Sequence, residues 1–224
     1  MESVSRDLQP GPFAARILSR RWLSPTAFEL TLERPPGFDF QPGQRVRLGI
    51  GPNARDYSIA AAPGGPDIVL CIRRVAGGEV STWLSKAGIG TELCGSGPHG
   101  YFTFTPSPRP AIFVATGTGV APFVSMARAG TKGFTLLHGV KRVEDLFYRN
   151  LLAASAQRYI ACLSEEAPVG SDVFAGRVTR HLERQVPPGT CDFYLCGRSE
   201  MIRDVTWLID DRFPGSRVYS EIFY

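Results

Sequence analysis

The segment that most constrains the fold runs from residue 111 to residue 129, with the sequence AIFVATGTGVAPFVSMARA. It opens with a short apolar run rich in β-branched and aromatic residues, which indicates a buried strand. Thr116-Gly117-Thr118-Gly119 follows, and its two glycines permit a tight turn and the close approach of another group to the backbone. Pro122 then stands where the first turn of a helix tolerates proline. The segment therefore predicts a strand, a glycine turn and a helix in succession.

A helix that begins after a buried strand directs unpaired N–H groups and the positive end of its dipole toward an anion. The segment is therefore either a phosphate-binding loop or an ordinary connection between a strand and a helix. It matches neither the G-x-G-x-x-G fingerprint nor the P-loop, which requires a lysine followed by a serine or threonine. From this segment alone, the two interpretations are equally supported.

The composition restricts the classes of protein to consider. The 224 residues, 43% apolar and 21% charged, are typical of a soluble globular protein with one large or two small domains. No apolar run reaches the length of a membrane span, and the N-terminus lacks the layout of a secretory signal. The five cysteines are scattered without iron–sulfur or zinc spacing. We therefore expect a cytoplasmic protein that binds neither a metal nor a membrane.

The net charge of +4 is dispersed along the chain and forms no basic stripe. This distribution argues against nucleic-acid binding. A mildly basic surface suits an acidic protein partner or an anionic cofactor, or it contributes only to solubility.

The first 105 residues are expected to form short strands separated by turns, at residues 13–18, 27–32, 44–50, 57–60 and 68–75. Strands at this spacing favour an antiparallel β-barrel or a sandwich. One helix is expected at residues 81–87, with Ser81 as its N-cap.

Three prolines within residues 105–110 mark a stiff connection, which predicts domains at 1–105 and 106–224. Beyond it, strands are expected at 134–139, 158–163, 191–196 and 217–223, alternating with helices at 143–156, 177–185 and 200–212. This alternation predicts a Rossmann-like α/β domain with a parallel sheet. Ligands of such sheets bind beyond the carboxyl ends of the strands, where residues 116–119, 138–139 and 196–198 fall.

Arg55-Asp56-Tyr57-Ser58 resembles the R-x-Y-S flavin signature of the ferredoxin–NAD(P)+ reductase family. Three further segments of the first half also resemble this family. Cys71-Ile72-Arg73 resembles the strand beside the flavin, and Gly78-Glu79-Val80-Ser81-Thr82 resembles the loop over the FAD pyrophosphate. Gly97-Pro98-His99-Gly100-Tyr101-Phe102 resembles the end of the barrel. In the second half, the pyridine-nucleotide loop of the family resembles Gly117-Thr118-Gly119-Val120-Ala121-Pro122. Its nicotinamide strand resembles Cys196-Gly197, and its acidic-aromatic C-terminus resembles Glu221-Ile222-Phe223-Tyr224. The resemblance implies an N-terminal FAD-binding β-barrel and a C-terminal NAD(P)-binding domain.

The flavin contacts implied by this resemblance have a physical basis. Arg55 can bind the charged pyrophosphate bidentately, and the turn at residues 78–82 offers backbone N–H groups. Tyr57 can cover the flavin ring with its apolar face, and Ser58 can form a hydrogen bond with flavin N5. The alternative for Tyr57 and Ser58 is an ordinary strand pair. The complete set of expected flavin contacts is Arg55, Tyr57, Ser58, Cys71, Ile72, Arg73, Gly78, Val80, Ser81, Thr82, Phe223 and Tyr224.

For the nicotinamide nucleotide, the resemblance implies contacts with Thr116, Gly117, Thr118, Gly119, Cys196, Gly197 and Arg198. Cys196 can hold the nicotinamide near the flavin, or it is a buried structural thiol. Glu221 can relay a proton, or it is a surface carboxylate. The family usually has one aromatic residue two positions after this glutamate, so Phe223 fits the stacking position and Tyr224 is an additional residue.

The choice of coenzyme depends on the stretch that follows the third strand of the second half. NADP-using relatives commonly place an arginine there, whereas this chain has Leu163-Ser164-Glu165-Glu166. Glu165 would repel a 2′-phosphate and accept hydrogen bonds from ribose hydroxyls, which favours NADH over NADPH. Arg198, or Lys141 with Arg142, are the alternative partners of a 2′-phosphate.

We therefore expect Ser58, Cys196 and Glu221 to act in hydride transfer from NAD(P)H to FAD. Since the chain lacks iron–sulfur ligands, electrons would pass to ferredoxin, flavodoxin or an oxygenase component, with the chain acting as a monomer. The alternatives are a reductase of free flavins, a non-catalytic flavin-binding electron-transfer subunit, and a nucleotide-binding domain beside an unrelated barrel. The widely spaced His99, His138 and His181 are expected to be structural.

Overall fold

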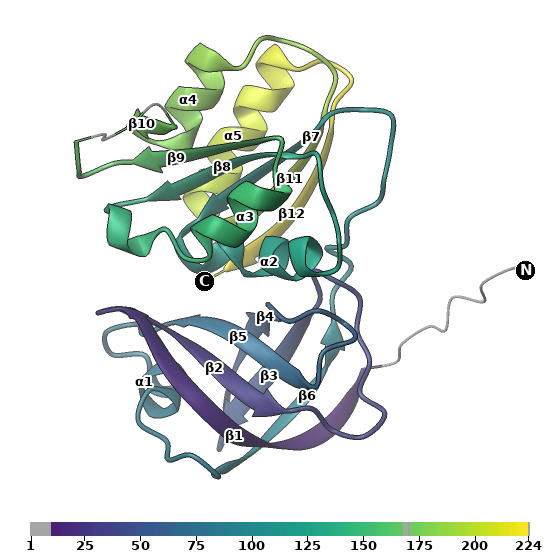
Figure 1. Cartoon of the computed structure of the whole chain (residues 1–224), viewed down its shortest axis with the longest axis vertical. Helices are drawn as coiled ribbons and strands as arrows, with labels where there is room; N and C mark the ends of the chain where they lie inside the picture. The colour runs from purple at the N-terminus through teal and green to yellow at the C-terminus, as the bar shows by residue number, and fades with distance from the viewer. Residues whose placement is uncertain (1–9, 168–169, 171, 224) are drawn as a thin grey trace, which may run out of the picture.

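The computed structural model describes residues 10–167, 170 and 172–223. Figure 1 shows two halves, one above the other, joined by the connection that follows β6. The elements of the N-terminal half are β1 (Gly11–Ser24), β2 (Ala27–Glu33), β3 (Arg45–Ile50), β4 (Asn53–Ser58), β5 (Asp67–Arg73), α1 (Glu79–Leu84) and β6 (Glu92–His99). Those of the C-terminal half are β7 (Ala111–Thr116), η1 (Gly117–Val120), α2 (Ala121–Arg128), β8 (Thr135–Val140), η2 (Val143–Asp145), α3 (Arg149–Ser155), β9 (Arg158–Leu163), β10 (Val173–Ala175), α4 (Val178–Gln185), β11 (Asp192–Arg198), α5 (Ser199–Arg212) and β12 (Arg217–Phe223).

The N-terminal half is a six-stranded antiparallel sheet with the order β4-β3-β6-β1-β2-β5. The sheet curls until its edges meet, where Ile59 forms a bridge with Leu70 just beyond the end of β4. Phe28 and Leu30 are among the apolar side chains that fill the interior, and Leu84 of α1 packs into the same core. The predicted antiparallel barrel is confirmed.

One barrel strand, β6, was absent from the sequence prediction because glycine and proline interrupt it and have low strand propensity. It pairs with both β1 and β3, so long-range pairing makes it a strand. A Cβ atom at Gly95 would stand 2.8 Å from side-chain atoms of Leu48 and Phe13. The glycine is therefore required by the close packing of β6 between its neighbours. Two further predictions were displaced, since β1 runs through Ser24 and β4 ends at Ser58.

The prediction that Ser81 caps α1 was wrong. The N-cap is Gly78, and the helix covers Glu79–Leu84, shorter than the range expected. Ser81 lies inside the helix, where its hydroxyl accepts a hydrogen bond of 3.1 Å from the N–H of Val75. The serine thus stabilises the turn that precedes the helix, which begins two residues earlier than predicted.

The C-terminal half is a parallel six-stranded sheet with the order β10-β9-β8-β7-β11-β12. On one face, Phe113 of β7 stacks on Phe123 of α2 with ring centroids 4.6 Å apart. On the other face, side chains of β7 and β11 pack against α4 and α5. Helices therefore cover both faces, and the predicted α/β class is confirmed.

The helix predicted at residues 143–156 is divided in two, because Tyr148 adopts a left-handed conformation (φ 56°) between η2 and α3. Its hydroxyl donates a 2.7 Å hydrogen bond to Glu29 of β2, and the Arg128 guanidinium lies 5.5 Å from its ring centroid. A contact with the other half of the molecule thus overrides the local helical periodicity.

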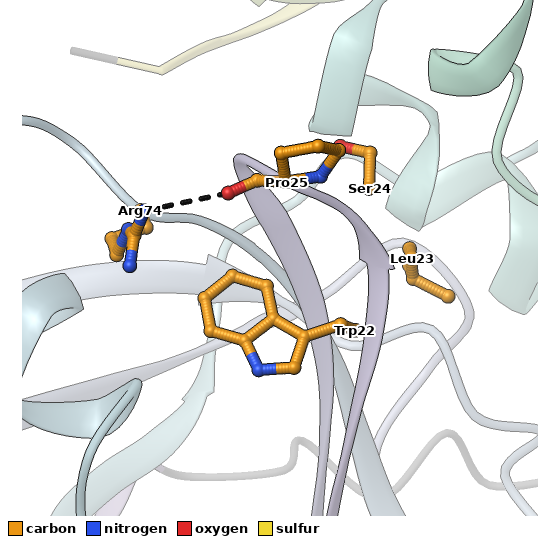
Figure 2. Close-up of a pocket in the computed structure, with 5 residues that line it drawn as sticks. All are labelled: Trp22, Leu23, Ser24, Pro25 and Arg74. Atoms are coloured by element: carbon orange, nitrogen blue, oxygen red, sulfur yellow. Dashed lines mark hydrogen bonds between the residues drawn. The ribbon is translucent and has the colours of Figure 1, made fainter.

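The two halves are also joined through α2. Ser125 donates a 2.7 Å hydrogen bond to the carbonyl of Ala61, and Arg128 donates one of the same length to Ala60. The tip of the β1–β2 hairpin lies beside Arg74, as Figure 2 shows. Within the described residues, no helix is both long and apolar enough to cross a membrane.

Candidate active site between the two halves

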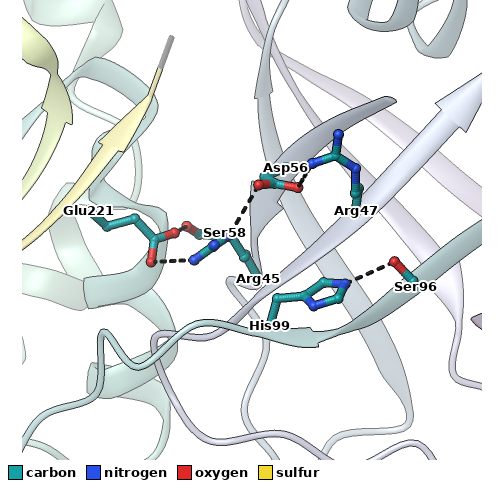
Figure 3. Close-up of polar contacts among 7 residues, drawn as sticks. All are labelled: Arg45, Arg47, Asp56, Ser58, Ser96, His99 and Glu221. Carbon is teal, nitrogen blue, oxygen red and sulfur yellow. Dashed lines mark hydrogen bonds and ion pairs between the residues drawn. The ribbon is translucent and has the colours of Figure 1, made fainter. Parts of the chain in front are cut away.

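Glu221 of β12 forms the centre of a polar cluster that joins the two halves (Figure 3). Its side chain is 8% exposed, and its Oε2 lies 3.3 Å from Nη1 of Arg45 on β3. Its Oε1 accepts a 3.3 Å hydrogen bond from the hydroxyl of Ser58 at the end of β4. Burial raises the pKa of Glu221, and Arg45 and Ser58 oppose this rise by stabilising the charged form. The carboxyl group can therefore hold a proton more readily than an exposed glutamate.

Strand pairing explains why Arg45 and Ser58 reach the same carboxylate. They are cross-strand partners in the β3–β4 pair, so their side chains lie on one face of the sheet. Gly100 leaves room beside them, because a Cβ atom there would clash with the Arg45 guanidinium. The barrel thus presents a cation and a hydroxyl together to Glu221.

Arg45 is a site residue that the sequence analysis missed. Its Nε lies 3.2 Å from Asp56, which is also 3.2 Å from Arg47. Asp56 belongs to the recognised R-x-Y-S segment, but Arg45 is on the neighbouring strand and outside every motif. Only strand register connects them, since Arg45 pairs with Ser58. The neighbouring His99 forms a 2.8 Å hydrogen bond with Ser96.

Cys196 is fully buried at the end of β11 and is the register partner of Glu221 in the β11–β12 pair. Burial raises the pKa of its thiol well above the ordinary value, and Glu221 adds to the shift. Cys196 therefore remains a neutral, compact thiol and is no thiolate nucleophile. Through Glu221, the structure brings together all three residues expected to act in catalysis.

The glycine turn expected to bind the nucleotide packs against the end of β11. Residues 117–120 form a short 3-10 helix before α2, and the Thr116 hydroxyl accepts a 3.0 Å hydrogen bond from the N–H of Arg198. A Cβ at Gly119 would clash with Cys196 and stand 2.7 Å from Cα of Gly197. Gly117 has a positive φ of 54° and open space where its Cβ would stand. Gly119 is thus needed for packing, and Gly117 leaves its backbone approachable.

The two segments expected to bind pyrophosphate are neighbours. Arg55 is exposed on β4, and Asn53 of the same strand forms a hydrogen bond with Glu79 in the first turn of α1. Tyr57 is half-buried, and burial raises its pKa to about 12, which keeps the phenol neutral. A guanidinium, a flat neutral ring and the backbone N–H groups of the first turn of α1 fit a flavin nucleotide.

Several side chains of the expected flavin set point into the protein. Ile72 and Val80 belong to the barrel core, whereas Cys71 packs in the core shared with the α/β half. Burial raises the pKa of Cys71 to about 12, and Arg73 is exposed. Because their side chains are buried, Cys71, Ile72 and Val80 can contact a ligand only through their backbone. The Thr82 hydroxyl lies 3.5 Å from the carbonyl of Val75.

The two candidates for stacking on the flavin are the last two residues of the chain. Phe223 is the last residue of β12, and Tyr224 lies outside the described residues. Neither ring is therefore placed, and the choice between them stays a prediction.

The stretch expected to select the coenzyme lines an open pocket of about 380 Å³. Glu165 forms a 2.6 Å ion pair with Lys141, which lowers its pKa. Arg177 and Arg180 line the same pocket and were missed, because they follow Glu165 in sequence by a complete strand. Their signal was an arginine pair at the start of a helix that faces the carboxyl edge of the sheet.

The three histidines lie apart and have separate surroundings. Nδ1 of His138 is 2.9 Å from the Tyr159 hydroxyl, and burial lowers the pKa of His138 to about 4. His181 packs edge-on against Phe174. His138 is thus a neutral core residue beside the glycine turn.

Comparison with known proteins agrees with this arrangement. A family model described as the oxidoreductase NAD-binding domain matches residues 113–206. The chain is 39% identical over 220 residues to ferredoxin–NADP reductase B of Sorangium cellulosum (strain So ce56), covering 87% of this chain and 90% of that protein. It is 31% identical over 217 residues to the toluate 1,2-dioxygenase electron transfer component of Pseudomonas putida, covering 90% of this chain and 64% of that protein.

The fold is also that of a solved structure. The crystal structure of a ferredoxin NADP+ reductase from Neisseria gonorrhoeae, with bound FAD and NADP, has a TM-score of 0.82. Its sequence is 21% identical, and the likeness covers 95% of this chain and 99% of that one. The 39% identity to the Sorangium protein, over almost the whole length of both chains, shows that this chain belongs to the ferredoxin–NADP reductase family of flavoenzymes.

Proposed function

We propose that this chain binds FAD between its two halves, accepts hydride from NAD(P)H and passes the electrons to a separate protein. The observation that carries the proposal is the contact of Glu221 with both Ser58 and Arg45, which unites the barrel and the α/β sheet in one polar site. Two substrates that must meet are commonly bound where two domains join.

Binding of FAD is supported by the residues of the barrel. Arg55 and the backbone of residues 78–82 would hold the pyrophosphate, and Tyr57 would cover the flavin ring. When bound, the flavin supplies the chemistry of hydride acceptance, and the protein supplies position and electrostatics.

The chain's own residues would manage the accompanying proton. Ser58 donates its hydroxyl hydrogen to Glu221, so the pair can move a proton between a bound ligand and the buried carboxylate. The raised pKa of Glu221 suits this task, because the carboxyl group takes up a proton at a higher pH than an ordinary glutamate does. Cys196 would leave space for the nicotinamide at the end of β11 and contributes no charge.

For the coenzyme, we extend the proposal beyond the NADH preference expected from sequence and propose that NADPH is also accepted. Lys141 neutralises Glu165 through a 2.6 Å ion pair, which weakens the repulsion that favoured NADH. Arg177 and Arg180 line the same pocket and can pair with a 2′-phosphate. Glu165 can still accept hydrogen bonds from ribose hydroxyls.

The acceptor is proposed to be a ferredoxin, a flavodoxin or an oxygenase component. Relatives named as a ferredoxin reductase and as a dioxygenase electron transfer component support a protein acceptor. Among the described residues, no group of three or more His, Cys, Asp or Glu side chains could hold a metal ion. A protein acceptor of this kind would carry its own redox centre.

The test is the absorption spectrum of the purified protein, followed by anaerobic titration with NADH and NADPH. We expect a yellow protein whose flavin absorbance is lost on titration and restored by ferredoxin or flavodoxin. A colourless protein that reduces added FMN would instead show a reductase of free flavins. A yellow protein that neither coenzyme bleaches would show a non-catalytic subunit.

A further inference from the structure

We propose that Trp22 and Arg74 bind the adenine ring of FAD, in a pocket beside the tip of the β1–β2 hairpin. This inference rests on the proposed binding of FAD and assigns to it residues that lie outside the motifs shared with the family. Figure 2 shows the pocket, which has a volume of about 370 Å³. Pockets of a few hundred cubic ångströms are typical for small organic ligands.

Trp22 presents a large flat surface that the protein leaves partly uncovered. Its side chain is 44% exposed, although it lies on a strand of the barrel. Phe28 supports the indole from the barrel core, with ring centroids 5.3 Å apart and the planes tilted by 56°. An exposed indole supported by the core is a stable platform for stacking by another aromatic ring.

The polar groups around the indole complement a purine. The Arg74 guanidinium lies 5.1 Å from the ring centroid of Trp22, and it donates a 3.4 Å hydrogen bond to the carbonyl oxygen of Pro25. Arginine can donate to the acceptor nitrogens of adenine and stack on its face, and a carbonyl oxygen can accept from the exocyclic amine. The long Arg74–Pro25 contact is weak, so the guanidinium can move to admit a ligand.

The position of the pocket indicates that its ligand is the adenine of FAD. The backbone N–H of Arg74 donates a 2.8 Å hydrogen bond to the carbonyl oxygen of Thr26, which holds Arg74 beside the hairpin tip. The N–H of Gly78 donates a 3.0 Å hydrogen bond to Val75, so a single turn connects Arg74 to the proposed pyrophosphate segment. In such a turn the first and fourth Cα atoms lie within about 7 Å. One ribose separates the adenine of FAD from its pyrophosphate, which matches this proximity.

The other adenine that the protein is proposed to bind belongs to NAD(P)H, and it has a different place. Its ribose is assigned to the pocket beside Glu165, at the carboxyl edge of the parallel sheet. The segment between β5 and α1, RVAGG, carries no aromatic side chain. Trp22, from another strand, is the aromatic side chain that lines the pocket beside this segment.

The experiment compares FAD with FMN, which lacks the adenosine. Apoprotein is titrated with each flavin by isothermal calorimetry for the native chain, Trp22→Ala and Arg74→Gln. Trp22→Ala is expected to raise the Kd for FAD about tenfold, as for the loss of one base–aromatic stack, and to leave the Kd for FMN unchanged. Arg74→Gln is expected to raise the FAD constant in the same direction. Binding of FAD should also quench the fluorescence of Trp22.

The chain offers a matched control on its other half. Trp207 is 65% exposed, and the Arg203 guanidinium lies 5.3 Å from its ring centroid, so Trp207→Ala removes a similar pair outside the pocket. This variant should bind FAD as the native chain does. FMN binding reports whether the barrel of each variant is intact, and Arg74→Gln keeps the indole in place should Trp22→Ala not fold.

Three outcomes separate the hypotheses. If the FAD and FMN constants change together, or if neither changes, the adenine inference is overturned while FAD binding stands. If the native chain binds neither flavin, the proposed function itself fails. If Trp207→Ala weakens FAD binding as much as Trp22→Ala, the pocket has no specific part in recognition.

Discussion

Arg45 and Glu221 are separated by 176 positions in sequence and form an ion pair of 3.3 Å between the barrel and the last strand of the α/β sheet. The carboxylate is nearly buried, whereas the guanidinium is 29% exposed and is shared with Asp56. This geometry makes Arg45 the residue that balances the cost of burying the Glu221 charge. It also makes the protonation of Glu221 adjustable by mutation.

Replacement of Arg45 should change the pH dependence of the reaction. Arg45→Gln removes the cation that favours the charged form of Glu221, so the already raised pKa of this carboxyl rises further. The ionised form then appears only at higher pH, and the corresponding limb of the pH–rate profile shifts upward. Stopped-flow oxidation of the reduced protein by its acceptor measures the shift.

Arg47→Gln is the matched control for that experiment. Arg47 contacts Asp56, as Arg45 does, but among the residues that the structure describes it forms no ion pair with Glu221. Equal shifts in the two profiles would mean that general surface charge, rather than the Arg45–Glu221 pair, governs the pH dependence.

Glu221→Gln should slow the transfer of electrons to the acceptor. Glutamine fills nearly the same volume but cannot take up a proton, and general acid–base groups contribute about a hundredfold or more to rate. Ser58→Ala should act on the same step, because the serine hydroxyl bonds directly to Glu221. The double variant should be little slower than either single one, since residues on one path are not additive. Fully additive losses would argue against a shared proton path.

Arg177→Ala should reduce the use of NADPH more than that of NADH. A hydrogen bond to a charged group contributes about 1.5–3 kcal/mol, so kcat/KM for NADPH is expected to fall roughly tenfold or more. Arg184→Ala is the control, because Arg184 lies on the same helix but does not line the pocket. An equal fall for both coenzymes would show that Arg177 does not contact the 2′-phosphate.

Two glycines of the same turn should respond differently to alanine. Gly119→Ala forces a Cβ against Cys196 and Gly197, and overpacking of this kind costs about 1–3 kcal/mol. Gly117→Ala meets open space and costs about 1–2 kcal/mol through its positive φ alone. Urea unfolding gives both stabilities. We expect only Gly119→Ala to disturb the end of β11 and thereby the environment of Cys196. A normal Cys196 environment in Gly119→Ala would contradict the packing role.

The order and class of most elements could be predicted from the sequence because their patterns are local. Alternating apolar residues indicated β2, and apolar runs between helical segments indicated β8, β9 and β11. Patterns of this kind depend on side-chain burial within one element, so they need no knowledge of its neighbours. The R-x-Y-S segment and the glycine turn were recognisable for the same reason.

The errors fall where distant contacts outweigh local preference. β6 is a strand because it lies between β1 and β3, despite its glycines and proline. The second half's first long helix is interrupted because Tyr148 bonds to Glu29 in the other half. Arg45, Arg177 and Trp22 belong to no motif, and only the paired strands and the pocket walls reveal what they contact.

The amino-acid sequence alone determined the two architectures and the family resemblance, and it was sufficient to nominate Ser58, Cys196 and Glu221 as candidate site residues, since each of these depends on short runs of residues. Only the tertiary structure decided which side chains surround Glu221, because Arg45 and Ser58 reach it through strand register and through the packing of one half on the other. The protonation of that carboxyl is likewise a tertiary property, since burial and a cation from a distant strand set its pKa.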